Sequence, residues 1–269
     1  MYLADYHTHS SVSPDGSVTV SELAQAAIDH GLDEICVTDH VDTILWGSHK
    51  PREDFDWPAL QAQVNEARRR YGHRLVIRMG AELGEAPMAF DRAEKLLADA
   101  PELDFVIGSV HMAGEKFQHF DLYYIEKRDE TYYHSVIDSY LEDVLRLARW
   151  GKFSVLGHLT LPLRYINESH GEQMTFAGHE DQCREIFRTL IENGCGIECN
   201  TNRGHDPLPD GPLLRLYREL GGEIITLGSD AHNTRYVGCA IRERQELLRQ
   251  CGFRYFTTFE GGTPAFRPL

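Results

Sequence analysis

Short apolar segments alternate with longer amphipathic segments along most of the chain, and this alternation limits the fold more than any other feature. Seven apolar runs are typical of buried strands, at residues 2–7, 34–38, 75–81, 105–110, 154–157, 196–199 and 223–228. Six segments with helical spacing of apolar residues lie among them, at 20–30, 57–71, 91–99, 131–150, 179–193 and 212–220. This order predicts an α/β fold with a parallel sheet, either a barrel or an open doubly wound sheet.

The chain gives no sign of division into parts. No internal repeat, low-complexity tract or proline- and serine-rich linker interrupts its 269 residues. A chain of this length buries a large core as one barrel-sized domain or as two smaller ones, and we expect a single domain over residues 1–269. Long segments follow several strands, at 41–56, 112–130 and 161–176, and in barrels such loops build the active site.

Charge and composition exclude several classes of partner. The formal net charge of −15 disfavours binding to nucleic acid and to anionic membranes. It also repels a phosphorylated substrate, unless bound divalent metals reverse the local field. We find neither a run of about 18 apolar residues, as a membrane span requires, nor the pattern of a signal peptide. Six scattered cysteines without a CxxC pair fit reduced thiols, so we expect a cytoplasmic protein.

The ends of the predicted strands carry an uncommon set of side chains. His7 and His9 close the first strand, and their spacing of two residues directs both side chains to one face. Asp230 and His232 close the seventh strand with the same spacing. Asp15 lies in a Pro-Asp-Gly turn shortly after the first strand. The residues that end the second to fifth strands are His40, Glu82, His111 and His158.

Each of these residues has an ordinary structural explanation when it is taken alone. A histidine at a strand end commonly makes a loop hydrogen bond, Asp230 fits a helix cap, and Asp15 is a common turn residue. Chance rarely places six histidines and two carboxylates at one end of a barrel. Imidazoles mixed with carboxylates suit zinc, manganese or iron, and the lack of cysteine argues against a closed structural zinc site. The joint pattern therefore predicts a catalytic metal centre.

The motifs around these residues resemble the polymerase and histidinol phosphatase (PHP) family, especially its stand-alone histidinol-phosphate phosphatase branch. The resemblance extends from residue 7 to residue 232. It rests on the motifs His7-Thr-His9, Thr38-Asp39-His40, Glu82, Ser109-Val-His111, Gly157-His158 and Ser229-Asp-Ala-His232. It implies a distorted seven-stranded (β/α)7 TIM-like barrel with three metals at the carboxyl-terminal mouth of the strands.

The resemblance also implies which residues hold each metal. One metal would take His7, His9, Glu82 and Asp230, with Glu82 bridging to a neighbour. A second metal would take Glu82, His111 and His158. The third metal would take Asp15, His40 and His232. Some relatives have histidine at position 15, so aspartate here makes the third site harder and more anionic.

A centre of this kind favours hydrolysis of a phosphate monoester. The expected nucleophile is a hydroxide that bridges two metals, because coordination lowers the pKa of water from about 16 to about 7. Asp230 or His232, directly or through water, are candidates to protonate the leaving alkoxide. Arg164 and Arg203 lie in loops after the fifth and sixth strands. Guanidinium matches phosphate bidentately, and the resemblance implies that arginines in these loops bind phosphate.

Residues for the organic part of the substrate are less well defined. Glu115, Asp121 and Asp42 lie in mouth loops and are candidates to bind an ammonium or imidazole group. Asp39 cannot share the face of His40 if the strand continues through both. We interpret Asp39 as a residue that orients a ligand or caps the chain.

The favoured function is hydrolysis of L-histidinol phosphate to L-histidinol and phosphate, a step of histidine biosynthesis. A PHP phosphoesterase for nucleotides or other small monoesters would use the same metals with different loops. A phosphotyrosine-protein phosphatase would require an open mouth at the active site, which the long loops disfavour. A non-catalytic metal-binding module would be expected to lose ligands, yet all nine positions are filled. An amidohydrolase would usually carry a lysine ligand, and no strand end supplies one.

Overall fold

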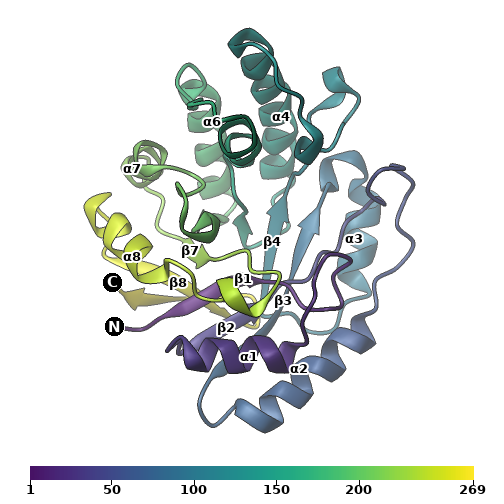
Figure 1. Cartoon of the computed structure of the whole chain (residues 1–269), viewed down its shortest axis with the longest axis vertical. Coiled ribbons are helices and arrows are strands. Elements are labelled where there is room, and N and C mark those ends of the chain that lie inside the picture. The colour runs from purple at the N-terminus through teal and green to yellow at the C-terminus, as the bar shows by residue number, and fades with distance from the viewer.

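Seven parallel strands form one continuous sheet in chain order. The computed structural model describes residues 1–269, and Figure 1 shows the strands at the centre of the molecule with helices around them. The strands are β1 (Ala4–Thr8), β2 (Glu34–Val37), β3 (Val76–Gly84), β4 (Phe105–Ser109), β5 (Val155–Leu156), β6 (Gly196–Asn200) and β7 (Ile225–Gly228). All seven expected strands are therefore present, with boundaries that shift by a few residues.

The first and last strands meet just beyond their carboxyl ends, and this contact nearly closes the sheet into a barrel. The His9 amide donates to the Ala231 carbonyl at 2.8 Å, and the Asp230 amide donates to the His7 carbonyl at 2.8 Å. Thr8 and Ala231 form a parallel bridge. The expected (β/α)7 TIM-like barrel is confirmed, and the alternative of an open doubly wound sheet is wrong.

Helices follow most strands and cover the outside of the barrel. The six expected helices are α1 (Val20–Asp29), α2 (Trp57–Tyr71), α3 (Phe90–Ala98), α4 (Glu130–Trp150), α6 (Glu180–Glu192) and α7 (Gly211–Glu219). Two further α-helices lie outside the expected ranges. One is α8 (Ile241–Gln250), and the other is α5 (Leu161–Leu163), which continues into the π-helical turn η4 (Arg164–Ser169).

The start of α1 illustrates how local sequence sets an element. The Thr19 side chain accepts from the Glu22 amide, and the Glu22 carboxylate accepts from the Thr19 amide at 2.8 Å. This capping box satisfies amide groups that lack a partner at a helix start. Leu23 and Ala27, four residues apart, are then buried on one face of the helix.

A carboxyl-terminal hairpin, β8 (Tyr255–Glu260) with β9 (Thr263–Pro268), was not predicted. It packs at the amino-terminal end of the barrel strands. The Phe259 amide donates to the Tyr6 hydroxyl at 2.7 Å, and the Phe259 ring lies 4.9 Å from that of Phe105. The hairpin lies close to β1 in Figure 1, where both chain ends are also found. This end of the barrel is therefore occupied, and the carboxyl-terminal mouth is left for a site.

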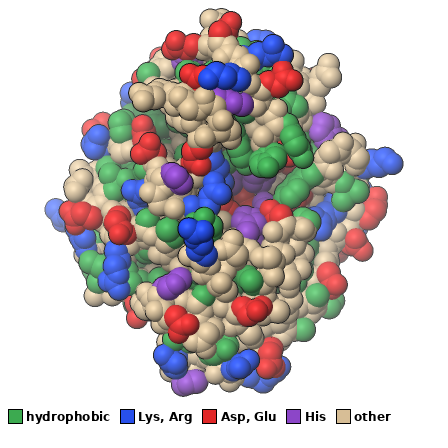
Figure 2. Space-filling view, in the orientation of Figure 1, with side chains coloured by type: hydrophobic (Ala, Val, Ile, Leu, Met, Phe, Trp, Pro, Cys, Tyr) green, Lys and Arg blue, Asp and Glu red, His purple; other side chains and the backbone are tan.

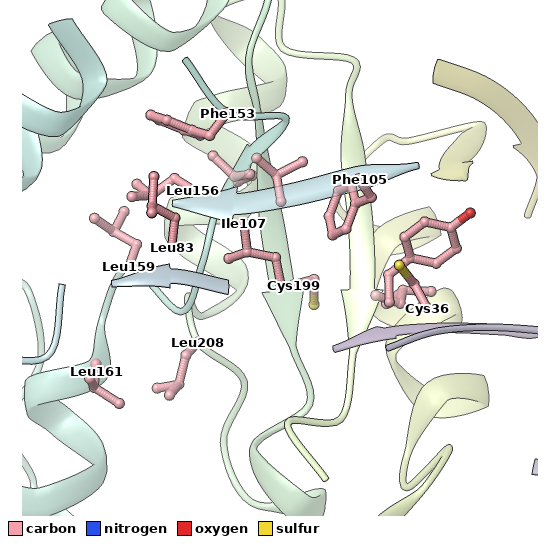
Figure 3. Close-up of a cluster of buried hydrophobic side chains, with 14 of the residues drawn as sticks. Cys36, Leu83, Phe105, Ile107, Phe153, Leu156, Leu159, Leu161, Cys199 and Leu208 are labelled. Carbon is pink, nitrogen blue, oxygen red and sulfur yellow. The ribbon is translucent and has the colours of Figure 1, made fainter. Parts of the chain in front are cut away.

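The apolar interior forms one cluster of 68 buried residues. Leu83, Ile107 and Leu156 come from three neighbouring strands and lie together in Figure 3. Burial of each such side chain contributes about 1.5–3 kcal/mol. All six cysteines are free thiols. None of the helices combines the length and the apolar composition that crossing a membrane would require.

Candidate metal centre

The nine side chains expected to hold metal gather at the carboxyl-terminal mouth of the barrel. Figure 2 shows a hollow near the centre of this face, with histidine and carboxylate atoms visible beside basic side chains. His7, His9 and Glu82 are fully buried, and His158 and His40 nearly so. The side chain of Asp15 is 39% exposed and is the most accessible of the set. Strand geometry explains this grouping, because the ends of parallel strands meet at one edge.

Glu82, in β3, lies at the centre of the group. Its Oε2 atom lies 3.1 Å from His7 Nε2, 3.4 Å from His9 Nε2 and 3.1 Å from His40 Nδ1. Its Oε1 atom faces the opposite pair of ligand candidates, at 2.9 Å from His158 Nε2 and 3.2 Å from His111 Nε2. One carboxylate thus faces five imidazoles, as a bridging ligand would.

Asp230 and Asp15 complete two of the expected sets. Asp230 Oδ1 lies 3.4 Å from His9 Nε2 and 3.6 Å from His7 Nε2. Asp15 Oδ2 lies 3.0 Å from His232 Nε2 and 3.8 Å from His40 Nε2. The structure therefore brings together the residues of all three expected sets, with His40 reaching both Glu82 and Asp15 through its two nitrogens.

Several buried atoms of this group have no hydrogen-bond partner, which tests whether a metal fits. They include His7 Nε2, His9 Nε2, His40 Nδ1 and Glu82 Oε2, and these four atoms face a common centre. Buried polar atoms are rarely left unpaired, and imidazole nitrogens with carboxylate oxygens are good ligands for divalent transition metals. Four groups of three donors have their ligand atoms within 4.8 Å of one another, but only one of them, His7 with His9 and Asp230, lies within a single expected set, and none includes Asp15. The donor set fits a multinuclear metal centre.

The charges of the group favour binding of a cation. Burial raises the pKa of Glu82, but His40 and His7 hold it well below its usual value. Burial lowers the pKa of His9 to about 3, and His232 adds to the effect. Burial also lowers the pKa of His7, yet Glu198, Glu82 and Asp230 raise it well above the usual 6.5. His9 is thus a ready neutral donor, whereas His7 must release a proton when metal binds.

Two carboxylates behind the histidines were missed in the sequence. Glu198 Oε1 lies 2.7 Å from His7 Nδ1, and Glu85 Oε1 lies 3.0 Å from His111 Nδ1. The sequence signal for Glu198 is a charged residue inside the apolar strand Gly196–Asn200. Glu85 follows Glu82 by three residues and adopts a left-handed backbone, with φ of 59°, and no pattern in the sequence marks it.

Asp39 lies beside the loop that follows β1, as one of its two expected roles requires. It accepts from the Ser10 hydroxyl at 2.7 Å and from the Ser13 hydroxyl at 3.0 Å. Ser13 Oγ in turn lies 3.3 Å from His9 Nδ1. Asp39 therefore orients the loop that supports His9.

Arg164 and Arg203 line one cavity of about 360 Å³ together with Asp15, Asp230 and His232. Arg164 is held rigidly, because it donates to Asp230 Oδ2 at 2.8 Å and to Asn202 Oδ1 at 2.8 Å. Arg203 is 40% exposed and lies 3.5 Å from Glu168. Both arginines thus reach the mouth of the candidate metal centre.

A second cavity of about 260 Å³ adjoins the first and has a more aromatic wall. Trp46, Tyr123 and Tyr124 line it, and Asp121 is among its carboxylates. Trp46 packs edge-on against His40, with ring centres 4.9 Å apart. Of the three acids considered for the organic part of a substrate, Asp121 alone lines this cavity. Glu115 is exposed elsewhere, and Asp42 is buried behind His40, 3.8 Å from its Nδ1 atom.

The fold and the site together define a β/α-barrel protein whose buried donor set suits divalent metals. Residues 5–202 match the PHP domain family, and the chain belongs to this family. The family resemblance found in the sequence is thereby confirmed.

Curated relatives and a solved structure match nearly the whole chain. A histidinol-phosphatase of Lactococcus lactis subsp. lactis is 30% identical over 264 residues, covering 96% of this chain and 94% of the relative. A probable histidinol-phosphatase of Deinococcus radiodurans is 28% identical, covering 95% and 96%. The crystal structure of histidinol phosphate phosphatase from Lactococcus lactis contains zinc, L-histidinol and phosphate. It superposes with a TM-score of 0.83 at 26% identity and 98% coverage of both chains.

Proposed function

We propose that this chain, as one domain over residues 1–269, hydrolyses L-histidinol phosphate to L-histidinol and phosphate. The observation that carries the proposal is that Arg164 and the candidate metal ligands Asp15, Asp230 and His232 line one cavity. The relative from Lactococcus lactis, whose structure holds zinc, L-histidinol and phosphate, supports the choice of substrate.

Three divalent metals are proposed to occupy the three sets of donors. The first set is His7, His9, Glu82 and Asp230, the second is Glu82, His111 and His158, and the third is Asp15, His40 and His232. Zinc is present in the relative, and manganese and iron also suit imidazole and carboxylate ligands. Metals bound there would lower the pKa of a coordinated water and offset the negative charge of the phosphate.

The chain's own residues bind and orient the ester. Arg164, fixed by Asp230 and Asn202, presents a guanidinium whose geometry matches phosphate, and Arg203 approaches the same cavity from a more exposed position. The leaving alkoxide needs a proton, and His232 is proposed to supply it directly or through a water. Asp230 is ionised, because despite burial His7 and Arg164 hold its pKa well below the usual value, so its proposed part is to orient a water that supplies the proton. Both line the two cavities at the point where they join.

The aromatic cavity is proposed to receive the organic part of the substrate. Histidinol carries an ammonium group and an imidazole ring. Asp121 offers a carboxylate that accepts a hydrogen bond from the Tyr123 backbone amide at 2.8 Å, and it forms no ion pair with a basic side chain. Trp46, Tyr123 and Tyr124 provide ring faces for a flat or cationic group.

A substrate panel tests the proposal. Phosphate release from L-histidinol phosphate by the metal-loaded protein is compared with release from nucleoside monophosphates and from p-nitrophenyl phosphate. We expect kcat/KM for L-histidinol phosphate to exceed that for the generic ester at least about 100-fold, as two specific polar contacts would give. Equal rates would reject the specific substrate, a preference for nucleotides would favour the other phosphoesterase, and no turnover would favour a non-catalytic module.

A further inference from the structure

Strand β6 supplies no candidate metal ligand, yet two of its polar side chains point toward the centre of the site. Glu198 and Asn200 are 1% and 0% exposed. Their spacing of two residues places both on one face of the strand, while Cys199 lies on the other. Burying a carboxylate and an amide at a strand end is costly unless both are fully hydrogen-bonded. The burial of these two polar side chains therefore indicates that they have a specific role.

Both oxygens of Glu198 are used. Oε1 accepts from His7 Nδ1 at 2.7 Å, and Oε2 accepts from the His158 backbone amide at 2.9 Å. The neighbouring strand makes room for this carboxylate, since a Cβ atom at Gly228 would lie 2.2 Å from Glu198 Oε1. Glu198 thus contacts residues from two of the three donor sets.

Asn200 extends the network toward the arginine. Its Nδ2 donates to Glu198 Oε2 at 3.2 Å, and its Oδ1 accepts from Arg164 Nη2 at 3.3 Å. Arg164 then donates to Asp230, whose other oxygen faces His7. The contacts form a ring that runs from His7 through β6 to Arg164 and back to the donor set.

We propose that Glu198 and Asn200 are positioning residues that couple the geometry of the metal centre to that of Arg164. Glu198 holds one proton of His7 on Nδ1, so the proton that leaves when metal binds comes from Nε2. The lone pair freed on Nε2 faces the space beside Glu82 and Asp230, where a metal would bind. Asn200 accepts from Nη2 of Arg164 and so fixes that side of the guanidinium. The first arm of this coupling, from Glu198 to His7, depends only on the donor set. The second arm, from Asn200 to Arg164, rests on the proposed function.

The variant Glu198→Gln tests the first arm. A glutamine amide has one donor and one acceptor. If its NH2 group faces the His158 amide, two donors oppose each other. If it faces His7 Nδ1, that nitrogen must lose its proton, and the proton moves to Nε2. The first orientation pushes the side chain away from both of its partners, and the second places a proton on the atom with which His7 would bind metal, so either outcome weakens metal binding by the donor sets.

Metal binding is measured by titrating metal-free protein with zinc against a chromophoric chelator. We expect Glu198→Gln to bind at least one of its zinc equivalents about 10- to 100-fold more weakly than the parent protein does. The matched control is Glu34→Gln, a fully buried carboxylate at the other end of the barrel that bonds Tyr6 and Arg78. Its zinc binding should not change. Unaltered zinc binding by folded Glu198→Gln would overturn the proposal.

Ring-nitrogen NMR of the zinc-loaded parent protein gives a second test that needs no variant. We expect the His7 proton on Nδ1 and the metal on Nε2. The opposite tautomer would overturn the role of Glu198, even if Glu198→Gln did not fold.

Asn200→Ala tests the second arm. Inorganic phosphate binding to the zinc-loaded protein, measured by calorimetry, should weaken about tenfold because Arg164 loses one partner, while zinc binding stays within about threefold. Unchanged phosphate affinity would overturn this arm. If the parent bound phosphate but did not hydrolyse L-histidinol phosphate, the proposed function would fail and the coupling would stand.

Discussion

Arg164 and Asp230 form a buried ion pair in which Nη1 donates to Oδ2 at 2.8 Å. The other oxygen of Asp230 lies 3.4 Å from His9 Nε2 and 3.6 Å from His7 Nε2. One carboxylate therefore joins the arginine proposed to hold phosphate to the histidines proposed to hold metal.

Replacing Arg164 should affect both binding and stability. In Arg164→Ala we expect kcat/KM to fall about 100-fold or more, because a charged, hydrogen-bonded contact to phosphate is lost. The variant leaves Asp230 buried without its partner, which costs about 3 kcal/mol of unfolding free energy in the metal-free protein. Steady-state kinetics and denaturant unfolding measure the two effects. Arg203→Ala, at a 40% exposed site, serves as comparison. Its kcat/KM and its unfolding free energy should both fall less than in Arg164→Ala.

Replacing Glu82 should remove the bridge between two metal sets. In Glu82→Gln one oxygen becomes an NH2 group, which cannot ligate metal and opposes the histidines around it. We expect loss of at least one metal equivalent and a fall in activity of about 1000-fold or more. Metal analysis and circular dichroism of the same sample separate loss of metal from loss of fold. A Glu82→Gln protein that kept full metal content and activity would remove Glu82 from the centre.

The stability of the metal-free protein should depend on pH in a defined direction. The pKa of His7 and of His111 lies well above 6.5, since nearby carboxylates outweigh burial. A group with a raised folded pKa stabilises fully below its unfolded pKa, and this contribution is lost as pH rises through the folded value. His9 and His40, whose pKa values are lowered, add no pH dependence above about 6.5.

We therefore expect the thermal midpoint of the metal-free protein to fall over the interval of pH above about 6.5. Zinc-loaded protein should show no such fall, because metal replaces the protons and binds better as pH rises. Scanning calorimetry of both forms measures this. A metal-free midpoint that rose over this interval would contradict the assigned charges.

Replacing Asp121 should change KM for one substrate and leave KM for another unchanged. Asp121→Asn removes a negative charge from the aromatic cavity, so we expect KM for L-histidinol phosphate to rise about five- to tenfold. KM for p-nitrophenyl phosphate, which has no ammonium group, should stay unchanged. Glu115→Gln, at an exposed position outside the cavity, is the matched control. An equal rise for both esters would assign Asp121 a general structural role.

The sequence predicted the elements whose pattern is local. All seven strands were found because each is a short apolar run. Eight of the nine candidate ligands were found because they end those runs, and Asp15 was added from the turn after the first run. Helix α8 was missed because its Arg-Glu-Arg-Gln-Glu stretch (242–246) is mostly polar and only Ile241, Gln245 and Leu248 are buried. The β9 strand escaped notice because most of its residues are exposed.

The parts of the site that depend on tertiary packing were not predictable. Glu115, Asp121 and Asp42 were equivalent as loop acids, and the path of each loop decides which one lines the cavity. Glu198 and Glu85 contact histidines 191 and 26 residues away along the chain. Such contacts leave no spacing pattern in a single sequence.

Metal analysis of the purified protein, followed by removal and return of the metal, tests whether the barrel mouth holds a metal centre on which hydrolysis depends. We expect two to three equivalents of zinc, manganese or iron per chain. Chelation should abolish phosphate release, and added metal should restore it. Fewer than about one equivalent in active protein, or activity that survives complete removal of metal, would contradict the metal centre.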